Sequence, residues 1–212
     1  MADNNSGLNQ LSSLQQDAIG EVLNIGMGAA GAALSEMVNH EVSLSVPYVE
    51  LLDQEIAIKH IKEANGENFK AVKEGFSGAF GGEALLFFSE SHSKDLVNIL
   101  LSKDNLPLEL AAEMEKEIIT EIGNIILNAC LGSLSNLFVK DLKLQLPSFV
   151  HGGYDTVINN AQKSNEHKDS ILLLKMKFSL KDQNITGFIT LLMAVDSAKA
   201  LTKEVSETFG ID

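Results

Sequence analysis

The chain has 212 residues, 45% of them hydrophobic and 21% charged, which is typical of a globular protein with one sizeable core or two halves that share one. A formal net charge of −13 argues against nucleic acid as a partner and against electrostatic anchoring at an anionic membrane. The single cysteine excludes an intrachain disulfide. The start of the chain is polar, unlike a signal peptide, and the longest apolar stretch, Gly187 to Val195, is too short to span a bilayer, so we expect a cytoplasmic protein.

The first predicted element is a helix from Leu11 to about Val38, because apolar residues recur there at helical spacing. We expect Ser12 or Ser13 to cap its start. The face that we expect to be buried consists of Leu14, Ala18, Val22, Ile25, Ala29, Ala33 and Met37. The opposite column is polar at the front and small at the back, and it consists of Asp17, Glu21, Asn24, Gly28, Gly31 and Ser35. Small residues there leave room for another protein or allow close packing on a neighbouring helix.

Three glycines in this helix imitate a dinucleotide-binding turn. Gly26, Gly28 and Gly31 fit the GxGxxG pattern, but that fingerprint requires a strand directly before it and a helix that opens at it. The residues before Gly26 have helical periodicity instead. We therefore expect no nucleotide site.

The rest of the first half reads as strands and a short helix. Val42, Leu44 and Val46 alternate with polar residues as in a half-buried strand, and we expect Pro47 to end it because proline has no amide hydrogen to donate. The further expected elements are a polar connection with one helical turn at 53–66, strands at about 68–80 and 83–89 joined near Gly81-Gly82, a helix at 92–101 and a turn at 103–107.

The second half follows the same order. The expected elements are a long helix at 108–139, a strand at 141–146 that ends at Pro147, a polar loop at 151–169, strands at 171–180 and 185–195, and a helix at 196–209 capped by Asp196 or Ser197. Cys130 falls on the buried face of the long helix, so we interpret it as a small core residue and not as a reactive thiol.

Residues 17–47 align without a gap with residues 117–147. The identical pairs are Ile19/Ile119, Glu21/Glu121, Asn24/Asn124, Ile25/Ile125, Ala29/Ala129, Leu34/Leu134, Ser35/Ser135, Leu44/Leu144 and Pro47/Pro147. We predict a single domain, residues 1–212, built from two internal repeats at about 11–105 and 106–212. The predicted fold is α/β (α+β) and two-fold pseudo-symmetric, with about six mainly antiparallel strands in one shared sheet and two long equivalent helices.

Each long helix carries a column of two carboxylates and a carboxamide on one face. The columns are Asp17, Glu21 and Asn24 in the first half, and Glu117, Glu121 and Asn124 in the second. In both halves 22 residues separate the asparagine from a proline, Pro47 or Pro147. A solvated helix face is the simplest explanation of such a column. Two features argue against it, because like charges four residues apart and asparagine in mid-helix both disfavour a helix, and both occur twice.

This spacing resembles the signature of the CheC/CheX/FliY phosphatases of bacterial and archaeal chemotaxis: aspartate or serine, three residues, glutamate, two residues, asparagine, 22 residues and proline. The first copy matches in full, and the second matches except that Glu117 replaces aspartate or serine. Two motifs in a chain of this length are similar to the CheC type, because the CheX type carries one motif in a shorter chain. We also expect the chain, which ends at Asp212, to lack the FliN-like extension of a full FliY.

The resemblance implies a protein aspartyl-phosphate phosphatase that acts on a phosphorylated CheY-type response regulator. It implies catalytic roles for Glu21, Asn24, Glu121 and Asn124. The asparagines would hold a water in line with the phosphorus, and the glutamates would dock the regulator through the lysine beside its phosphorylation site. Asp17 and Glu117 would assist docking, and Pro47 and Pro147 would be structural.

We expect no metal site and no cofactor of the chain's own, because the five histidines are scattered and none pairs with another at ligand spacing. Mg²⁺ would be supplied by the regulator's site. The alternative function is a non-catalytic binding or regulatory module, since the middle domain of the flagellar switch protein FliM is similar in fold to CheC but lacks the glutamate and asparagine pairs. CheD, the receptor deamidase, is a further candidate partner, and a response regulator outside chemotaxis is a candidate substrate.

Overall fold

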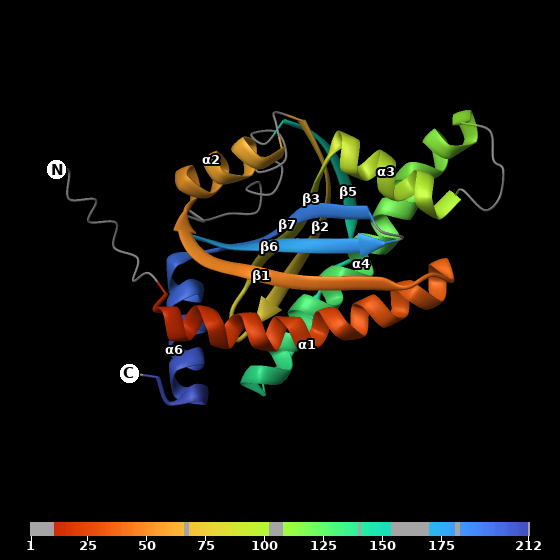
Figure 1. Cartoon of the computed structure of the whole chain (residues 1–212). Helices are drawn as coiled ribbons and strands as arrows, with labels where there is room; N and C mark the ends of the chain where they lie inside the picture. Colours follow the sequence, from red (N-terminus) through yellow and green to blue (C-terminus); the bar gives the residue numbers. More distant parts are fainter. Residues whose placement is uncertain are drawn as a thin grey trace.

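Two long helices, α1 (Ser13–Val38) and α4 (Leu108–Phe138), pack on one face of a single twisted sheet (Figure 1). The computed structural model describes residues 11–65, 68–101, 108–139, 141–153, 170–180 and 183–211. Two shorter helices, α3 (Glu90–Leu101) and α6 (Val195–Phe209), contribute to the same core, whereas α2 (Gln54–Asn65) packs on the opposite face.

The sheet is antiparallel at every described strand pair. Its strands are β1 (Val42–Asp53), β2 (Asn68–Gly78), β3 (Gly82–Ser89), β4 (Leu142–Leu144), β5 (Ser148–Gly153), β6 (Ser170–Leu180) and β7 (Gln183–Met193). In the described part of the chain they run in the order β1-β6-β7-β3-β2, and β4 and β5 both pair with the outer side of β2. This arrangement confirms the predicted fold class.

The halves of the chain are interleaved in the sheet. β1, from the first half, pairs with β6 of the second half, and β4 and β5, from the second half, pair with β2 of the first. The hairpins β2–β3 and β6–β7 meet at the centre, where β3 pairs with β7. The sheet is therefore shared, while the division into repeats at 11–105 and 106–212 stays a prediction.

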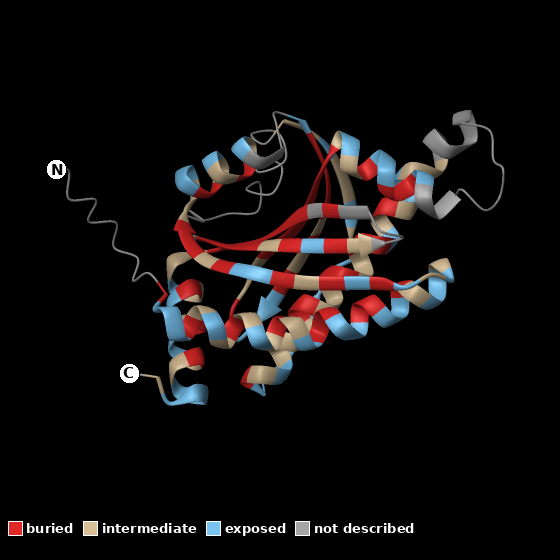
Figure 2. Ribbon diagram, in the orientation of Figure 1, coloured by how far each residue is buried: buried red, intermediate tan, exposed pale blue. Residues whose placement is uncertain are grey.

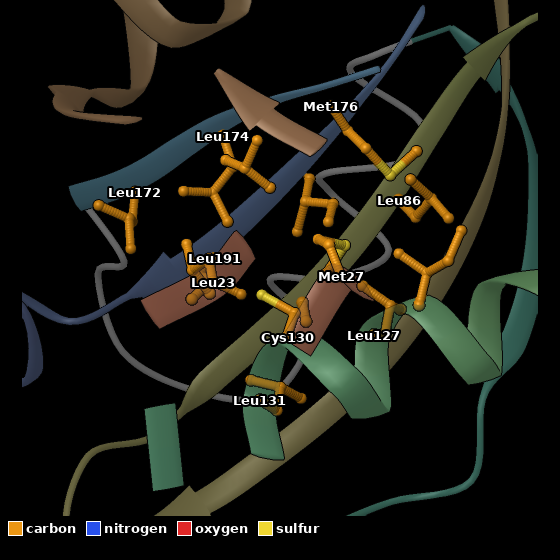
Figure 3. Packing of buried hydrophobic residues seen from close by; sticks show 14 of the residues in the cluster. Leu23, Met27, Leu86, Leu127, Cys130, Leu131, Leu172, Leu174, Met176 and Leu191 are labelled. Carbon is orange, nitrogen blue, oxygen red and sulfur yellow. The ribbon is translucent and has the colours of Figure 1, made fainter. Parts of the chain in front are cut away.

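The larger core cluster lies between the sheet and the helices α1, α4 and α6. Figure 3 shows Leu23 and Met27 of α1 and Leu127 and Cys130 of α4 pointing toward the leucines of the sheet. Burial raises the pKa of the Cys130 thiol to about 12, which confirms that it is a core residue and not a reactive thiolate. A smaller cluster under α2 buries Ala57 and Ile61 against the other face of the sheet.

The predicted buried face of α1 is wrong. The side chains of Leu14, Ile25 and Met37 are 64%, 70% and 47% exposed, and Ala29 and Ala33 are exposed as well. Figure 2 shows buried and exposed residues alternating along this helix. The helix instead buries the column Ile19, Leu23, Met27, Ala30 and Leu34. Both columns recur at helical spacing, and the second has more bulk to remove from water, so its burial is the more favourable of the two.

Three other sequence predictions need correction. The predicted connection at 53–66 contains the amphipathic helix α2. Its residues Ala57, Ile58 and Ile61 pack against the sheet. The strand predicted at 141–146 is only three residues long, and a second strand, β5, begins after Pro147 and extends into the predicted loop. Asp196 and Ser197 do not cap α6, because its N-cap is Ala194, which has no side-chain acceptor.

The remaining elements confirm their predictions to within a few residues, including the capping of α1 by Ser12, whose side chain forms a capping box with Gln15. The turn predicted at 103–107, residues 154–169 of the predicted loop and the polar N-terminus at 1–10 lie outside the described residues.

By length and composition alone, Ser13–Val38 and Met114–Phe138 could each cross a membrane. In the fold, each of the two helices buries part of its apolar residues in the core: Leu23 and Met27 of α1, and Leu127 and Leu131 of α4, have no exposed surface. The core therefore accounts for part of the apolar character of both helices.

Candidate functional site

The first motif lines a hollow between α1 and β1. The hollow has a volume of about 430 Å³, and its walls are Gln16, Asp17, Gly20, Glu21, Asn24, Val46, Pro47, Tyr48 and Val49. All four motif residues of the first half, Asp17, Glu21, Asn24 and Pro47, are among them. The carboxylates of Asp17 and Glu21 are exposed to solvent, and Asn24 is half-buried beneath them. The structure thus brings the predicted residues of the first copy together.

A β-bulge explains why the motif ends in proline. The register between β1 and β6 shifts between Ser45 and Tyr48, so that Val46 and Pro47 face a single residue of β6. At a bulge the ladder loses hydrogen bonds, and Pro47 has no N–H that would be left without a partner. The prediction that Pro47 ends the strand is therefore wrong: β1 continues through it to Asp53.

Asn24 replaces the missing ladder contacts of Val46. The Asn24 Nδ2 donates to the Val46 carbonyl at 3.3 Å, and the Val46 N–H donates to Asn24 Oδ1 at 2.8 Å. Val46 is only 2% exposed, so its backbone groups would otherwise be buried without partners. Sequence reasoning missed this contact, because it depends on the bulge in β1, whereas the interval of 22 residues between asparagine and proline is the same in both copies.

Asn24 is held in place without being saturated. A carboxamide has two N–H donors and an oxygen with two lone pairs, and the contacts with Val46 use one of each. One N–H and one lone pair remain for a molecule in the hollow. The side chain is thus oriented in advance by the strand and can still bind a water on its other side.

The hollow is acidic. Within the residues that the structure describes, no lysine or histidine pairs with Asp17 or Glu21. At the rim, the Tyr48 hydroxyl contacts the carboxylate of Glu50. The site therefore presents two exposed carboxylates beside an oriented carboxamide, a set that suits a cationic side chain and a water.

The second motif lies on α4 in a different setting. Glu117 and Glu121 are exposed and Asn124 is half-buried, as in the first copy. The Asn124 Oδ1, however, accepts a hydrogen bond of 2.7 Å from Asn128 Nδ2, one turn later in the same helix. Leu146, which aligns with the buried Val46, is 92% exposed. Pro147 lies in the gap between β4 and β5.

The glycine pattern has a packing explanation. A Cβ on Gly26 would lie 2.0 Å from Ser133 Oγ of α4, and a Cβ on Gly31 would lie 3.0 Å from the Val42 carbonyl of β1. These two glycines let α1 approach α4 and β1 closely. All three glycines lie inside α1, which begins at Ser13, so the turn of a nucleotide site is not formed here.

The titratable groups outside the two motifs include a histidine that pairs with a glutamate, and a buried carboxyl. A hydrogen bond from His151, at 3.0 Å, lowers the pKa of Glu90. Burial raises the pKa of Glu74 in β2 to about 7, and one of its carboxylate oxygens has no hydrogen-bond partner in the described structure. Over the described ranges, no three His, Cys, Asp or Glu side chains are grouped as a metal site would require.

Comparison with known proteins places the fold. No family model matches the chain. The chain is 24% identical over 206 residues to the flagellar motor switch phosphatase FliY of Bacillus subtilis (strain 168); the match covers 94% of this chain and 52% of FliY, so the chain spans about half the length of that curated relative.

Solved structures that share the fold include a FliY and a FliM middle domain. The crystal structure of Thermotoga maritima FliY aligns with a TM-score of 0.71 at 16% identity, over 93% of this chain and 98% of that one. The FliM middle domain from H. pylori aligns with a TM-score of 0.64 at 9% identity, over 92% and 99% of the two chains. Together with the sequence match, these structures confirm the predicted resemblance to the CheC/CheX/FliY family.

Proposed function

We propose, on the premise of this resemblance, that the chain hydrolyses the aspartyl phosphate of a CheY-type response regulator. The observation that carries the proposal is the carboxamide of Asn24, which is hydrogen-bonded to Val46 in an acidic hollow and keeps one N–H and one oxygen lone pair for another molecule. The sequence relative that covers the chain is named as a phosphatase, which agrees in kind.

The chemistry asks little of the protein. A phosphorylated aspartate is an acyl phosphate, which is already reactive, so catalysis consists mainly of placing a water in line with the phosphorus. The free lone pair of Asn24 would accept one hydrogen of that water, and its free N–H would contact an oxygen of the phosphoryl group. The water oxygen bonds to phosphorus, the bond between phosphorus and the carboxyl oxygen breaks, and inorganic phosphate leaves with the water's protons.

The acidic residues would hold the regulator in place. Glu21 lies close to one helical turn before Asn24 and lines the same hollow. A lysine of the regulator that contacts Glu21 would therefore bring the neighbouring phosphoryl group toward the carboxamide of Asn24. Asp17 adds a second carboxylate on the same column. We assign Glu121, Asn124 and Glu117 the corresponding roles on α4. The chain would need no cofactor of its own, because Mg²⁺ belongs to the regulator's site, and both proteins would work in the cytoplasm.

A second candidate function is a binding module of the flagellar switch. The likeness in fold to the FliM middle domain favours it, and CheD is a further partner that the family resemblance suggests. The two functions differ in one property, since a binding module leaves the lifetime of the phosphoryl group unchanged.

The test is the decay of a phosphorylated CheY-type regulator from the same organism, followed with and without the chain. We expect faster decay with the wild-type chain, and no acceleration with the double variant Asn24→Ala/Asn124→Ala. An unchanged decay in the presence of wild-type chain that binds the regulator would favour the binding module.

A further inference from the structure

We propose that the first motif takes the regulator in preference to the second, and that Gly20 is the residue that selects it. This inference rests on the proposed function and adds a residue that the family signature does not contain. Gly20 lies one helical turn before Asn24 and lines the hollow together with Asp17 and Glu21. Its lack of a side chain keeps open the part of the hollow that a long cationic side chain of the partner would enter.

Packing does not require glycine at this position. A Cβ added to Gly20 would have Val49 Cγ2 as its nearest neighbour, at 3.8 Å, which is an ordinary contact. Gly26 differs, because the same addition there would collide with α4. Glycine inside a helix is less favourable than alanine by roughly 1 kcal/mol. Gly20 therefore weakens its helix without allowing a close contact between elements. The open space that it leaves in the hollow explains its presence.

The second motif fills the same space. Thr120 aligns with Gly20, and its hydroxyl donates to the Lys116 carbonyl at 2.6 Å, which fixes the side chain on the motif face of α4. A partner's side chain that reaches Glu121 and Asn124 along the helix surface therefore meets a threonine. At the first motif the equivalent path is open.

Charge favours the first motif as well. Gln16 of the hollow aligns with Lys116, which is exposed on α4 next to Glu117. The second column thus carries a cation of its own, whereas the first offers two carboxylates without one. A lysine from the partner would be attracted more strongly to the first column, because a like charge beside the second opposes it.

An apolar contact accompanies the open hollow. Ile25 directly follows Asn24 and is 70% exposed, while the identical Ile125 packs against the core cluster. The same amino acid is thus available to a partner in one copy and used for folding in the other. The occupant that fits the first copy is the regulator's surface around its phosphorylated aspartate, with the neighbouring lysine in the hollow and an apolar contact to Ile25.

The experiment measures two quantities for each variant: the affinity for the regulator loaded with beryllofluoride, which mimics the phosphoryl group without being hydrolysed, and the concentration dependence of phosphoryl decay. The variants are Gly20→Ala, Gly20→Thr and Gly132→Thr. Gly132 is the matched control, since it too lies in a long helix where an added Cβ meets no close contact: nothing lies within 4 Å of it, and it is two turns away from Asn124.

We expect Gly20→Thr to weaken binding on the order of tenfold and Gly20→Ala to weaken it about twofold, while Gly132→Thr binds as wild type. The loss should appear in the concentration needed for half-maximal decay and not in the rate at saturation, because Gly20 acts in docking. Alanine and threonine both have a higher helix propensity than glycine. A loss of affinity that grows from alanine to threonine would therefore not come from a loss of helix stability.

Two outcomes would overturn the inference. Wild-type affinity for Gly20→Thr would show that the open space is not used. An equal loss for Gly132→Thr would show that any added threonine disturbs the protein. If the wild-type chain neither binds the loaded regulator nor accelerates decay, the proposed function fails first, and the inference falls with it.

Discussion

The two motif helices carry nearly the same residues in different settings. On α1 the asparagine is bonded to the backbone of a buried bulge in β1, and the following isoleucine is open to solvent. On α4 the asparagine is bonded within its own helix, and the following isoleucine belongs to the core. The comparison teaches that a motif in a sequence fixes the chemical groups, while the strand opposite the helix decides what those groups are free to do.

The largest expected difference between the copies is in catalysis. Asn24→Ala should slow the accelerated decay of the phosphorylated regulator on the order of 100-fold, as the loss of an oriented polar group does in other active sites. Asn124→Ala should cost much less, because it leaves intact the first copy, which we infer to be the one that takes the regulator in preference. Regulator decay under single-turnover conditions measures both. A greater loss for Asn124→Ala would reverse the assignment of the principal site.

The same pair of variants should differ in stability. Asn24→Ala leaves the N–H and carbonyl of the buried Val46 without partners, so we expect unfolding to become easier by about 1–3 kcal/mol. Asn124→Ala removes a contact between two half-buried side chains of one helix and should cost under about 1 kcal/mol. Urea unfolding measures both values; equal losses would mean that the contacts with Val46 carry no stability.

The place where the two motif helices meet offers a second matched pair. Gly26→Ala would force a methyl group against Ser133 and the Ala129 carbonyl of α4, and we expect a loss of about 1–3 kcal/mol. Gly28→Ala has open space around it and should instead stabilise the chain by up to about 1 kcal/mol. Thermal unfolding of the two variants checks the signs, and a stable Gly26→Ala would contradict the close crossing.

Burial of a carboxyl in one half should make stability depend on pH. Glu74 in β2 is buried, with a pKa of about 7 against an ordinary value of 4.5. Between these values the folded chain binds more protons at Glu74 than the unfolded chain does, so stability falls as pH rises from about 4.5 to about 7.

Glu74→Leu tests this by replacing the buried carboxyl with an apolar side chain. We expect the variant to gain about 1–2 kcal/mol relative to wild type between about pH 5 and about pH 8, with most of the gain at the upper end. Urea unfolding at both pH values measures it. If the stabilities of the wild type and the variant changed equally between these two pH values, the pH dependence could not be assigned to Glu74.

The smallest expected effect concerns the one departure from the family signature. Glu117→Asp restores the signature in the second copy, and we expect it to change the decay of the regulator by no more than about threefold, because exposed charges contribute about 0–1 kcal/mol. The measurement is best made in the Asn24→Ala background, where the second copy acts alone. A large gain would show that Glu117, and not Thr120 or Lys116, sets that copy apart.

Much of the fold followed from sequence because several local signals agreed. The alternation in β1, the glycine pair between β2 and β3 and the long periodic helices each predicted their elements. The buried face of α1 could not be chosen in this way, because two apolar columns share the same period and only the neighbouring strand and α4 decide between them. β5 was missed because its His151-Gly152-Gly153 end resembles a loop until β2 is placed beside it.

The candidate site, like the fold, was predicted from sequence only in part. Helical spacing predicted that Asp17, Glu21 and Asn24 would lie in one column, and the structure brings them to one hollow together with Pro47. Spacing could not predict the hydrogen bonds between Asn24 and Val46, which depend on the bulge, or the exposure of Leu146. The contacts of Asn24 and the exposure of Leu146 depend on residues far apart in the chain, and a local pattern does not contain them.

The interleaving of the sheet has a consequence for how the chain folds. β1 begins by pairing Val42 with Leu180, so its partner strand is synthesised only after most of the chain has left the ribosome. Until then β1 has no partner among the described strands, and the bulge beside the first motif cannot form. Contacts between such distant residues close slowly, and we expect a slow final folding step in which the site is assembled last. A chain truncated before β6 would hold every residue of the first motif and still lack its geometry.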